Sequence, residues 1–314
     1  MLLLHLMFFL CPEKIRAIYV DHQLQSISGE WSAFVHQQCQ QLNIPCIIQA
    51  RQSRYQAYLQ HLQPDEILVL AHHQQDQAET LMLRLLSGAG IDGLAAMKAI
   101  DIRHDLTIWR PLLDISREQI CQWAADLNIQ NIEDPTNQNT HYDRAWARQV
   151  LWPVLSHRYP KMQSALARTS ELMQDAQNIL QEVLEQDLKF CGNDEILNLF
   201  PLLSLSKARQ RQLLSVWMKG EGQYRPSLDM VKRVQTEVIK AKQDTQAALH
   251  WSGYYYVRYQ QQLHRLKAEV YLADQQLNVA EQQIILQNKD QVHLPSGQFG
   301  IQRAEIGLSP TLLG

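Results

Sequence analysis

The segment Ala71-His72-His73-Gln74-Gln75-Asp76-Gln77-Ala78-Glu79-Thr80 joins a predicted strand to a predicted helix. The apolar run before it, residues 66–70, is typical of a buried strand. Asp76 and Glu79 are predicted to lie within about 60° of each other on one side of the helix, with His73 nearby. Because ligands of open parallel sheets bind at the carboxyl ends of the strands, the segment predicts a ligand site. The opposite side of the helix carries an apolar repeat at i, i+3, i+4 and i+7, made of Ala78, Leu81, Met82 and Leu85.

A plain structural role explains the same pattern. Acids are common in the first turn of a helix because they complement its dipole and cap free N–H groups. His73 fits packing at a helix start about as well as it fits an orienting role in a site. The spacing alone therefore leaves both interpretations of these side chains open.

Strands and helices alternate on the N-terminal side of this segment. Strands are predicted over residues 15–20, 45–48 and 67–70, with helices over 28–42 and 51–62 between them. Alternation at this spacing favours an α/β fold with a parallel, Rossmann-like sheet and right-handed connections.

Beyond residue 142 the pattern becomes helical. Residues 161–188 predict one long amphipathic helix, and residues 202–242 predict two more, interrupted near Gly220 and Pro226. Alternating side chains over 251–266 favour a small sheet, and residues 284–301 favour further strands.

Composition excludes several classes of protein. The chain has 314 residues, 46% of them hydrophobic, and a net charge of −3, so two or three globular domains are expected and any RNA contact must use local patches. The five cysteines include no C-x-x-C pair, which favours reduced, mostly buried thiols over disulfides or a zinc site. The apolar residues 1–11 are too few for a bilayer, which needs about 20, and lack the marks of a signal peptide.

Four further motifs accompany the acid pair in a fixed order. They are A-R-Q-S-R-Y at residues 50–55, a glycine-punctuated helix exit at 84–94, W-R-P-L-L at 109–113 and E-D-P-T-N at 133–137. This ordered set resembles the tRNA(Ile)-lysidine synthetases, a family of the PP-loop ATP pyrophosphatase superfamily. The resemblance covers residues 1–294. It implies an N-terminal PP-loop-type α/β domain, a mostly helical substrate-binding domain and a partial β-rich C-terminal segment.

The resemblance also implies domain boundaries and an activity. The expected parts are a catalytic domain over 1–158, a linker helix over 159–190, a tRNA-binding domain over 191–270 and a partial C-terminal domain over 271–314. The family uses ATP and Mg²⁺ to activate the wobble cytidine of an isoleucine tRNA with a CAU anticodon, and the ε-amino group of free lysine then attacks to form lysidine. A cytoplasmic protein without membrane contact is expected, with a homodimer as one possible state.

Roles are carried over from the family motifs residue by residue. Asp76, Glu79 and His73 match the catalytic set, with Asp76 as the Mg²⁺ ligand. The ATP-binding set is Asp21, His22, Gly88 and Gly90, although the two glycines fit a simple helix stop equally well. The substrate-binding set is Arg51, Arg54, Arg110, Asp134 and Asn137. The tRNA-binding set is Arg144, Arg148, Lys207, Arg209, Arg211, Lys232 and Arg233, with Trp217 and Tyr224 beside the last five.

Departures from the family pattern carry expectations of their own. The family's S-G-G-x-D-S loop, which cradles the ATP phosphates, and a first strand are expected directly before the helix that here begins at Leu2, whereas the sequence starts at Met1. The family's final domain is also expected to continue further. Loss of the loop should abolish ATP binding, and loss of the strand should expose a sheet edge.

Three alternatives stay open. An inactive, truncated remnant would bind tRNA without ATP. Another PP-loop tRNA-modifying enzyme is the second alternative, but a thiolase should show paired cysteines, and none are present. A nucleotide-binding α/β protein without RNA would keep its function after charge reversal at Lys207, Arg209 and Arg211.

Overall fold

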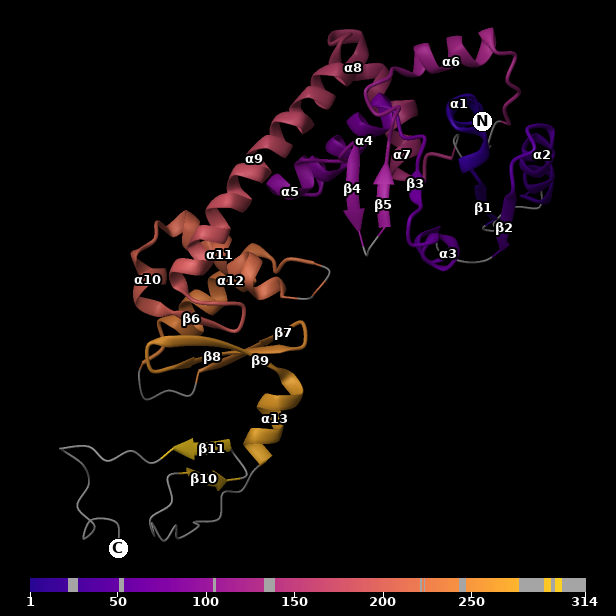
Figure 1. Ribbon diagram of the computed structural model, residues 1–314. Helices are drawn as coiled ribbons and strands as arrows, with labels where there is room; N and C mark the ends of the chain where they lie inside the picture. Colours follow the sequence, from indigo (N-terminus) through magenta and orange to yellow (C-terminus); the bar gives the residue numbers. More distant parts are fainter. Residues whose placement is uncertain are drawn as a thin grey trace, which may run out of the picture. The chain divides into compact units, whose positions relative to one another are not determined.

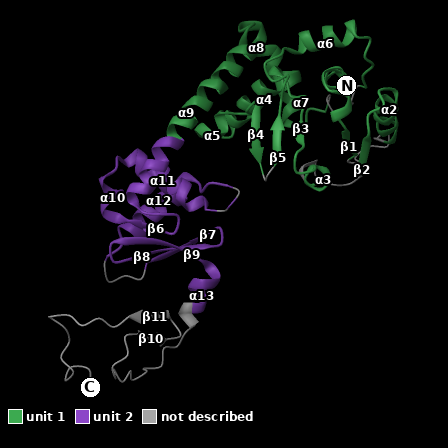
Figure 2. Ribbon diagram, in the orientation of Figure 1, with its two compact units in different colours: residues 1–180 green, residues 181–314 purple. Residues whose placement is uncertain are grey.

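The computed structural model describes residues 1–21, 28–50, 54–103, 106–132, 139–220, 222, 224–242, 247–276, 291–294 and 297–300. The chain divides into two compact units, residues 1–180 and 181–314 (Figure 2). The four-part division expected from the resemblance is finer than this one and stays a prediction.

Unit 1 begins with the alternating pattern that the sequence predicts (Figure 1). The strands and helices of the alternating part lie within a few residues of their predicted bounds, since apolar periodicity specifies both kinds of element. In chain order these elements are α1 (Leu2–Leu10), η1 (Pro12–Lys14), β1 (Ala17–Asp21), α2 (Ser28–Gln41), β2 (Cys46–Ala50), α3 (Arg54–His61), β3 (Ile67–Val69) and α4 (Gln74–Leu86).

The second half of unit 1 adds a strand pair and a series of helices. Helix α6 starts at a capping box, in which Ser116 Oγ accepts from the Gln119 N–H at 3.2 Å. The elements are α5 (Ile91–Leu94), β4 (Ile100–Arg103), β5 (Leu106–Trp109), α6 (Arg117–Asp126), α7 (Asp143–Trp146), the π-helical turn η3 (Ala147–Leu151), α8 (Trp152–Arg158) and α9 (Met162–Cys191), which continues into unit 2.

The parallel strands of unit 1 form two separate sheets in the described part of the chain. β1 pairs in parallel with β2, while β3 pairs in parallel with β5 and β4 adds antiparallel to β5. A cavity of about 530 Å³ is lined by residues 14–18, which lead into β1, by residues 65–71 around β3, and by Leu3, Leu4 and Met7 of α1. The parallel fold class is therefore confirmed, and β1 and β3 meet at a cavity instead of a shared hydrogen-bond ladder.

Two apolar clusters lie in unit 1, and the second of them includes helix α4. Leu68, Leu106 and Ile108 form a cluster on the β3–β5 sheet. Ala78 of α4 packs with Trp152 and Met162, against which Met82, Leu151, Leu155 and Leu166 also lie. Since Ala78 and Met82 belong to the predicted apolar repeat, the opposite side of α4 is left for polar side chains.

Unit 2 is a helical layer on a four-stranded antiparallel sheet of order β6-β9-β8-β7 (Figure 1). Tyr256, Leu213, Leu214 and Leu263 lie in its core. Its elements are β6 (Ile196–Asn198), α10 (Leu199–Ser204), α11 (Lys207–Lys219), α12 (Leu228–Arg233), the π-helical turn η4 (Val234–Ile239), β7 (Ala248–Trp251), β8 (Tyr254–Tyr259), β9 (Gln262–Lys267), α13 (Ala268–Gln276), β10 (Gln291–Leu294) and β11 (Gly297–Gly300).

Two remaining expectations concern cysteines and membranes. All five cysteines are free, but only Cys39 and Cys191 are buried, so the expectation that most are buried is wrong. Burial raises the pKa of the Cys39 thiol to about 12 and that of Cys191 to about 11. Across the described residues, no helix has the length and apolar content that a membrane crossing requires.

Candidate active site at the start of helix α4

The polar side of helix α4 begins with a capped turn built from His73 and Asp76. His73 is the N-cap residue, and its Nδ1 accepts a hydrogen bond from the Gln75 N–H at 3.2 Å. Asp76 Oδ2 accepts from the His73 N–H at 3.1 Å and lies 3.6 Å from His73 Nε2. The reciprocal contacts fix both side chains against the helix start. Both the structural and the catalytic interpretation of His73 are compatible with this geometry.

Glu79 is the most enclosed member of the site. It is fully buried, whereas Asp76 keeps 13% of its side-chain surface exposed. Glu79 Oε1 accepts from Gln75 Nε2 at 3.0 Å, a contact between residues four apart on one face of the helix. A buried carboxylate is costly unless a cation or several donors compensate for its lost hydration.

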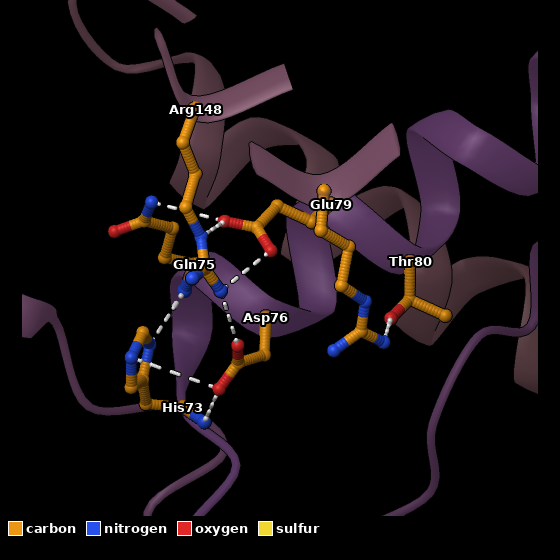
Figure 3. Close-up of polar contacts among 7 residues, drawn as sticks. His73, Gln75, Asp76, Glu79, Thr80 and Arg148 are labelled. Atoms are coloured by element: carbon orange, nitrogen blue, oxygen red, sulfur yellow. Dashed lines mark hydrogen bonds and ion pairs between the residues drawn. The ribbon is translucent and has the colours of Figure 1, made fainter. Parts of the chain in front are cut away.

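Arg148 supplies that cation from the π-helical turn η3 (Figure 3). Its Nε lies 2.5 Å from Glu79 Oε1, and its Nη2 lies 2.9 Å from Glu79 Oε2 and 3.2 Å from Asp76 Oδ1. The hydrogen bond to Glu79 raises the pKa of the Arg148 guanidinium above its ordinary value. Nearby, Arg144 Nη2 donates to Thr80 Oγ1 at 3.4 Å. The two acids therefore form one cation site, which Arg148 fills.

The predicted tRNA-binding residues of unit 2 differ in their charge balance. Arg209 forms a two-pronged ion pair with the buried Asp187, in which Nε lies 2.9 Å from Oδ2. Arg233 pairs with Glu237 at 2.8 Å, and Lys232 lies 3.4 Å from Asp229. Within the described ranges, no ion pair involves Lys207 or Arg211. Three of the five predicted tRNA-binding residues of unit 2 are thus paired with carboxylates within the unit.

Comparisons with known proteins follow the same two-part division. Residues 1–155 match a PP-loop domain family, and residues 197–264 match the TilS substrate binding domain. A tRNA(Ile)-lysidine synthase of Acinetobacter baylyi is 56% identical over 87% of this chain and 62% of its own length. A second, from Escherichia coli O157:H7, is 33% identical over 92% of this chain and 69% of its own length. The chain belongs to the tRNA(Ile)-lysidine synthase family.

Coverage of the relatives is incomplete. The chain spans about three fifths to two thirds of the first relatives that it matches, with 62% for the Acinetobacter protein and 66% for a synthase of Actinobacillus pleuropneumoniae. A U34-tRNA thiolase of Methanococcus maripaludis overlaps with a TM-score of 0.44 at 13% identity, over 55% of this chain and 67% of that one. An overlap this low says nothing about function.

The lysidine synthase motifs around the acid pair include one buried arginine. Arg110, expected to bind substrate, has 2% of its side chain exposed; its Nη1 donates to the Lys98 carbonyl at 2.7 Å and lies 3.9 Å from Asp101 Oδ2. This placement favours a role in holding the strand pair β4–β5, and its substrate-binding role stays a prediction.

The glycines of the lysidine synthase loop after α4 have a structural explanation. Gly88 has φ +75°, its N–H donates to the Leu85 carbonyl at 3.0 Å, and the next N–H, of Ala89, donates to Arg84 at 2.9 Å. These are the two hydrogen bonds of a Schellman helix end. Gly90 caps the start of α5. The N–H groups of Gly88 and Ala89 are therefore used by the helix end, and ATP binding by Gly88 and Gly90 stays a prediction.

The other expected ligand residues are described only in part. Asp21, at the end of β1, is buried and accepts a hydrogen bond from Ser32 Oγ at 3.2 Å. His22, Arg51, Asp134 and Asn137 lie outside the described residues, as does the side chain of Arg54. Their lysidine synthase roles stay predictions.

Trp217 was predicted to join the phosphate-binding surface, and this prediction is wrong. The residue is 3% exposed, and its Nε1 donates to the Asn193 carbonyl at 2.9 Å. Arg265 lies 5.5 Å from the ring centroid, so the indole belongs to the packed interior of unit 2. Tyr224, by contrast, is 72% exposed.

Two contacts of the site are not part of any sequence motif. The contact of Gln75 with Glu79 could have been predicted from helical spacing, because an amide four residues before a carboxylate on the same helix can reach it. Arg148 lies 69 positions from Glu79, and no local pattern joins them. Arg148 itself was predicted only as a contact to tRNA.

The donor set fits a divalent metal only in part. Carboxylate oxygens suit Mg²⁺, which commonly takes one or two of them together with phosphates and water. Among the described residues no group of three metal-ligating side chains exists, and Arg148 already holds the acid pair. A Mg²⁺ ion bound here would need further ligands from a phosphate, and Arg148 would have to move away from the two acids.

Proposed function

We propose that the chain carries out, or is the main part of a protein that carries out, lysidine formation on isoleucine tRNA. The observation that carries the proposal is 56% identity to a tRNA(Ile)-lysidine synthase, together with a buried acid pair at a strand–helix junction. ATP would transfer its adenylyl group to the oxygen on C2 of the wobble cytidine, with release of pyrophosphate. The lysine ε-amine would then form the new C–N bond as AMP leaves.

Asp76 and Glu79 are the proposed binding site for the lysine side chain. Both are carboxylates on one side of α4, and together they hold a guanidinium, which indicates that they accept a cation. An ammonium bound there must lose a proton before it can act as a nucleophile, and a carboxylate can accept it. Asp76, the more exposed acid, would also contact Mg²⁺, which supplies positive charge against the departing pyrophosphate.

The partners follow from the same proposal. Free lysine, ATP and an isoleucine tRNA with a CAU anticodon are the substrates. The exposed Lys207 and the half-buried Arg211 are the best candidates for RNA phosphate contacts. We propose a cytoplasmic protein, and a homodimer stays possible under this proposal.

The test is ATP-dependent incorporation of labelled lysine into that tRNA. The 314-residue chain is compared with a form extended upstream by a strand and an S-G-G-x-D-S segment. Asp76→Asn and Glu79→Gln should each lower incorporation by about a hundredfold or more in whichever form is active. Asp175→Asn removes an exposed carboxylate on α9 and should leave the rate unchanged. Full activity of either acid variant would contradict the proposal, and so would a failure of both forms to incorporate lysine.

A further inference from the structure

The four carboxylate oxygens of Asp76 and Glu79 all have donors (Figure 3). Arg148 donates to three of the four, Glu79 Oε1 and Oε2 and Asp76 Oδ1. The other donors are the His73 N–H and the Gln75 amide. Among the described residues, Arg148 is the one donor that helix α4 and its N-cap do not supply. A cation from solution that takes over the three oxygens bound by Arg148 must therefore replace Arg148.

The acids are held firmly, whereas the arginine has a path to solvent. Glu79 is fully buried, and Asp76 is fastened to the helix start by the His73 N–H. Arg148 keeps 26% of its side chain exposed and starts from the π-helical turn η3. Turns of this kind are frequent at functional sites. The guanidinium can thus swing outward on its long side chain while both carboxylates stay in place.

We propose that Arg148 is an internal counter-ion that occupies the place of the substrate's ammonium group at Asp76 and Glu79, and that it leaves when that group binds. The inference rests on the proposed function for the identity of the amine. A buried carboxylate that loses its only cation is strongly disfavoured, so Glu79 is paired with one cation or the other. Arg148 is in this sense a positioning residue that keeps the cation site intact between turnovers.

The exchange has a second consequence for anions. Once an ammonium takes its place, the Arg148 guanidinium is available for a phosphate oxygen, for which its planar fork is well suited. Arg148 would thus contact the acids in the absence of lysine, as observed, and the tRNA in its presence, as predicted. Binding of lysine and binding of RNA should then favour each other, and by linkage the effect is equal in both directions.

The first test measures binding of L-lysine by calorimetry, without ATP or tRNA. Arg148→Gln removes the competing cation and should bind lysine at least tenfold more tightly than the parent chain. Norleucine, which lacks the ε-amine, should show no such gain. Arg158→Gln makes the same change in net charge at an exposed position at the end of α8, where the side chain lies over the Tyr159 ring, and should bind lysine as the parent does. Equal or weaker lysine binding by a folded Arg148→Gln variant would overturn the inference.

A second measurement uses the parent chain, in case Arg148→Gln does not fold. The Nε–H resonance of Arg148 in a nitrogen-15 NMR spectrum reports its hydrogen bond to Glu79. Saturating lysine should shift this resonance and speed its exchange with water, and norleucine should do neither. An unchanged resonance with lysine bound would overturn the inference. Loss of lysine incorporation with the NMR response intact would count against the proposed function alone.

The coupling to RNA gives a third readout. Addition of the isoleucine tRNA should tighten lysine binding to the parent chain several-fold, and Arg148→Lys should reduce this effect because an ammonium cannot bind phosphate in the two-pronged manner. Equal coupling in the parent and in Arg148→Gln would show that Arg148 does not exchange between the acids and the phosphate.

Discussion

Arg209 and Arg211 lie on the same helix, α11, but their guanidinium groups have different surroundings. Arg209 is engaged with Asp187, a carboxylate with 1% of its side chain exposed. That contact raises the pKa of Arg209 and uses its two-pronged face. Among the residues that the structure describes, no acidic side chain forms an ion pair with Arg211. The two arginines, equal in sequence, should therefore have separate roles.

We expect the two substitutions to affect different quantities. Arg211→Gln should weaken tRNA binding several-fold and reduce the dependence of log Kd on log salt by about 1, as the loss of one phosphate contact does. Arg209→Gln should mainly lower the midpoint of unfolding in urea, because Asp187 loses its partner. Filter binding at several salt concentrations and urea titrations of both variants make the comparison. A larger RNA effect for Arg209→Gln would contradict this assignment.

At the same scale, part of the site could be predicted. The acid pair, its histidine and their common side of α4 follow from helical geometry, which depends only on local spacing. The pairing of Glu79 with Arg148 does not, because it depends on how the turn η3 meets α4 in the folded unit. Burial likewise separates Arg110 and Trp217 from surface positions that look similar in sequence.

Helix α4 ends at Gly88, whose backbone conformation an L-residue adopts only with strain. Gly88 has φ +75°, and nothing lies within 4 Å of the position where a Cβ would stand. The cost of a side chain there is thus backbone strain alone, with no collision added. Gly29 in helix α2 also has nothing within 4 Å of its Cβ position but has an ordinary helical backbone.

Two alanine substitutions should therefore have opposite signs. Gly88→Ala should lower the free energy of unfolding by about 1–2 kcal/mol, the cost of placing an L-residue in the left-handed region. Gly29→Ala should raise it by about 0.4–1 kcal/mol, since it reduces the freedom of the unfolded chain. Urea unfolding followed by circular dichroism measures both. A stabilised Gly88→Ala variant would mean that the Schellman end of α4 has been misjudged.

Elements were predictable where one periodicity extended over several turns. Helix α9 matches its predicted range, residues 161–188, within about three residues because its apolar repeat is continuous. Strand β4 was not predicted, since Ile100 and Ile102 are mostly exposed and its placement comes from antiparallel pairing with β5. Pairing of this kind is decided by the neighbour and leaves little signal in four residues.

In unit 1 as a whole, an ion pair links the segments that lead into β1 and β3. Arg16, just before β1, donates to both carboxylate oxygens of Glu66, just before β3, with Nε to Oε1 at 2.6 Å, and also to the His61 carbonyl. Both residues border the cavity between the strands. The hydrogen bond from Arg16 lowers the pKa of Glu66 from its ordinary value of 4.5. The Arg16–Glu66 ion pair thus links the two sheets of the unit, and protonation of Glu66 in acid removes it.

The sign of the pH effect follows from that lowered pKa. The stabilisation is fully present above about pH 4.5 and is lost as the pH falls through the lower pKa of the folded state. Glu66→Gln should lower stability at pH 7 and flatten the decline below pH 4.5 relative to the parent chain. Urea midpoints at several pH values measure the difference between the two. Parallel pH profiles for parent and variant would show that Glu66 does not contribute.

The sequence by itself determined the α/β class, the alternation of strands and helices over residues 15–70, strands within residues 251–266 of unit 2 and the position of the acid pair. All of these depend on local periodicity and on motifs, which can be recognised without knowing which distant residues become neighbours in the fold. Only the tertiary structure decided that the parallel strands form two sheets beside a cavity, and that Arg148 fills the acid pair. Those features arise because residues far apart in the chain compete for the same hydrogen-bonding groups and the same buried space.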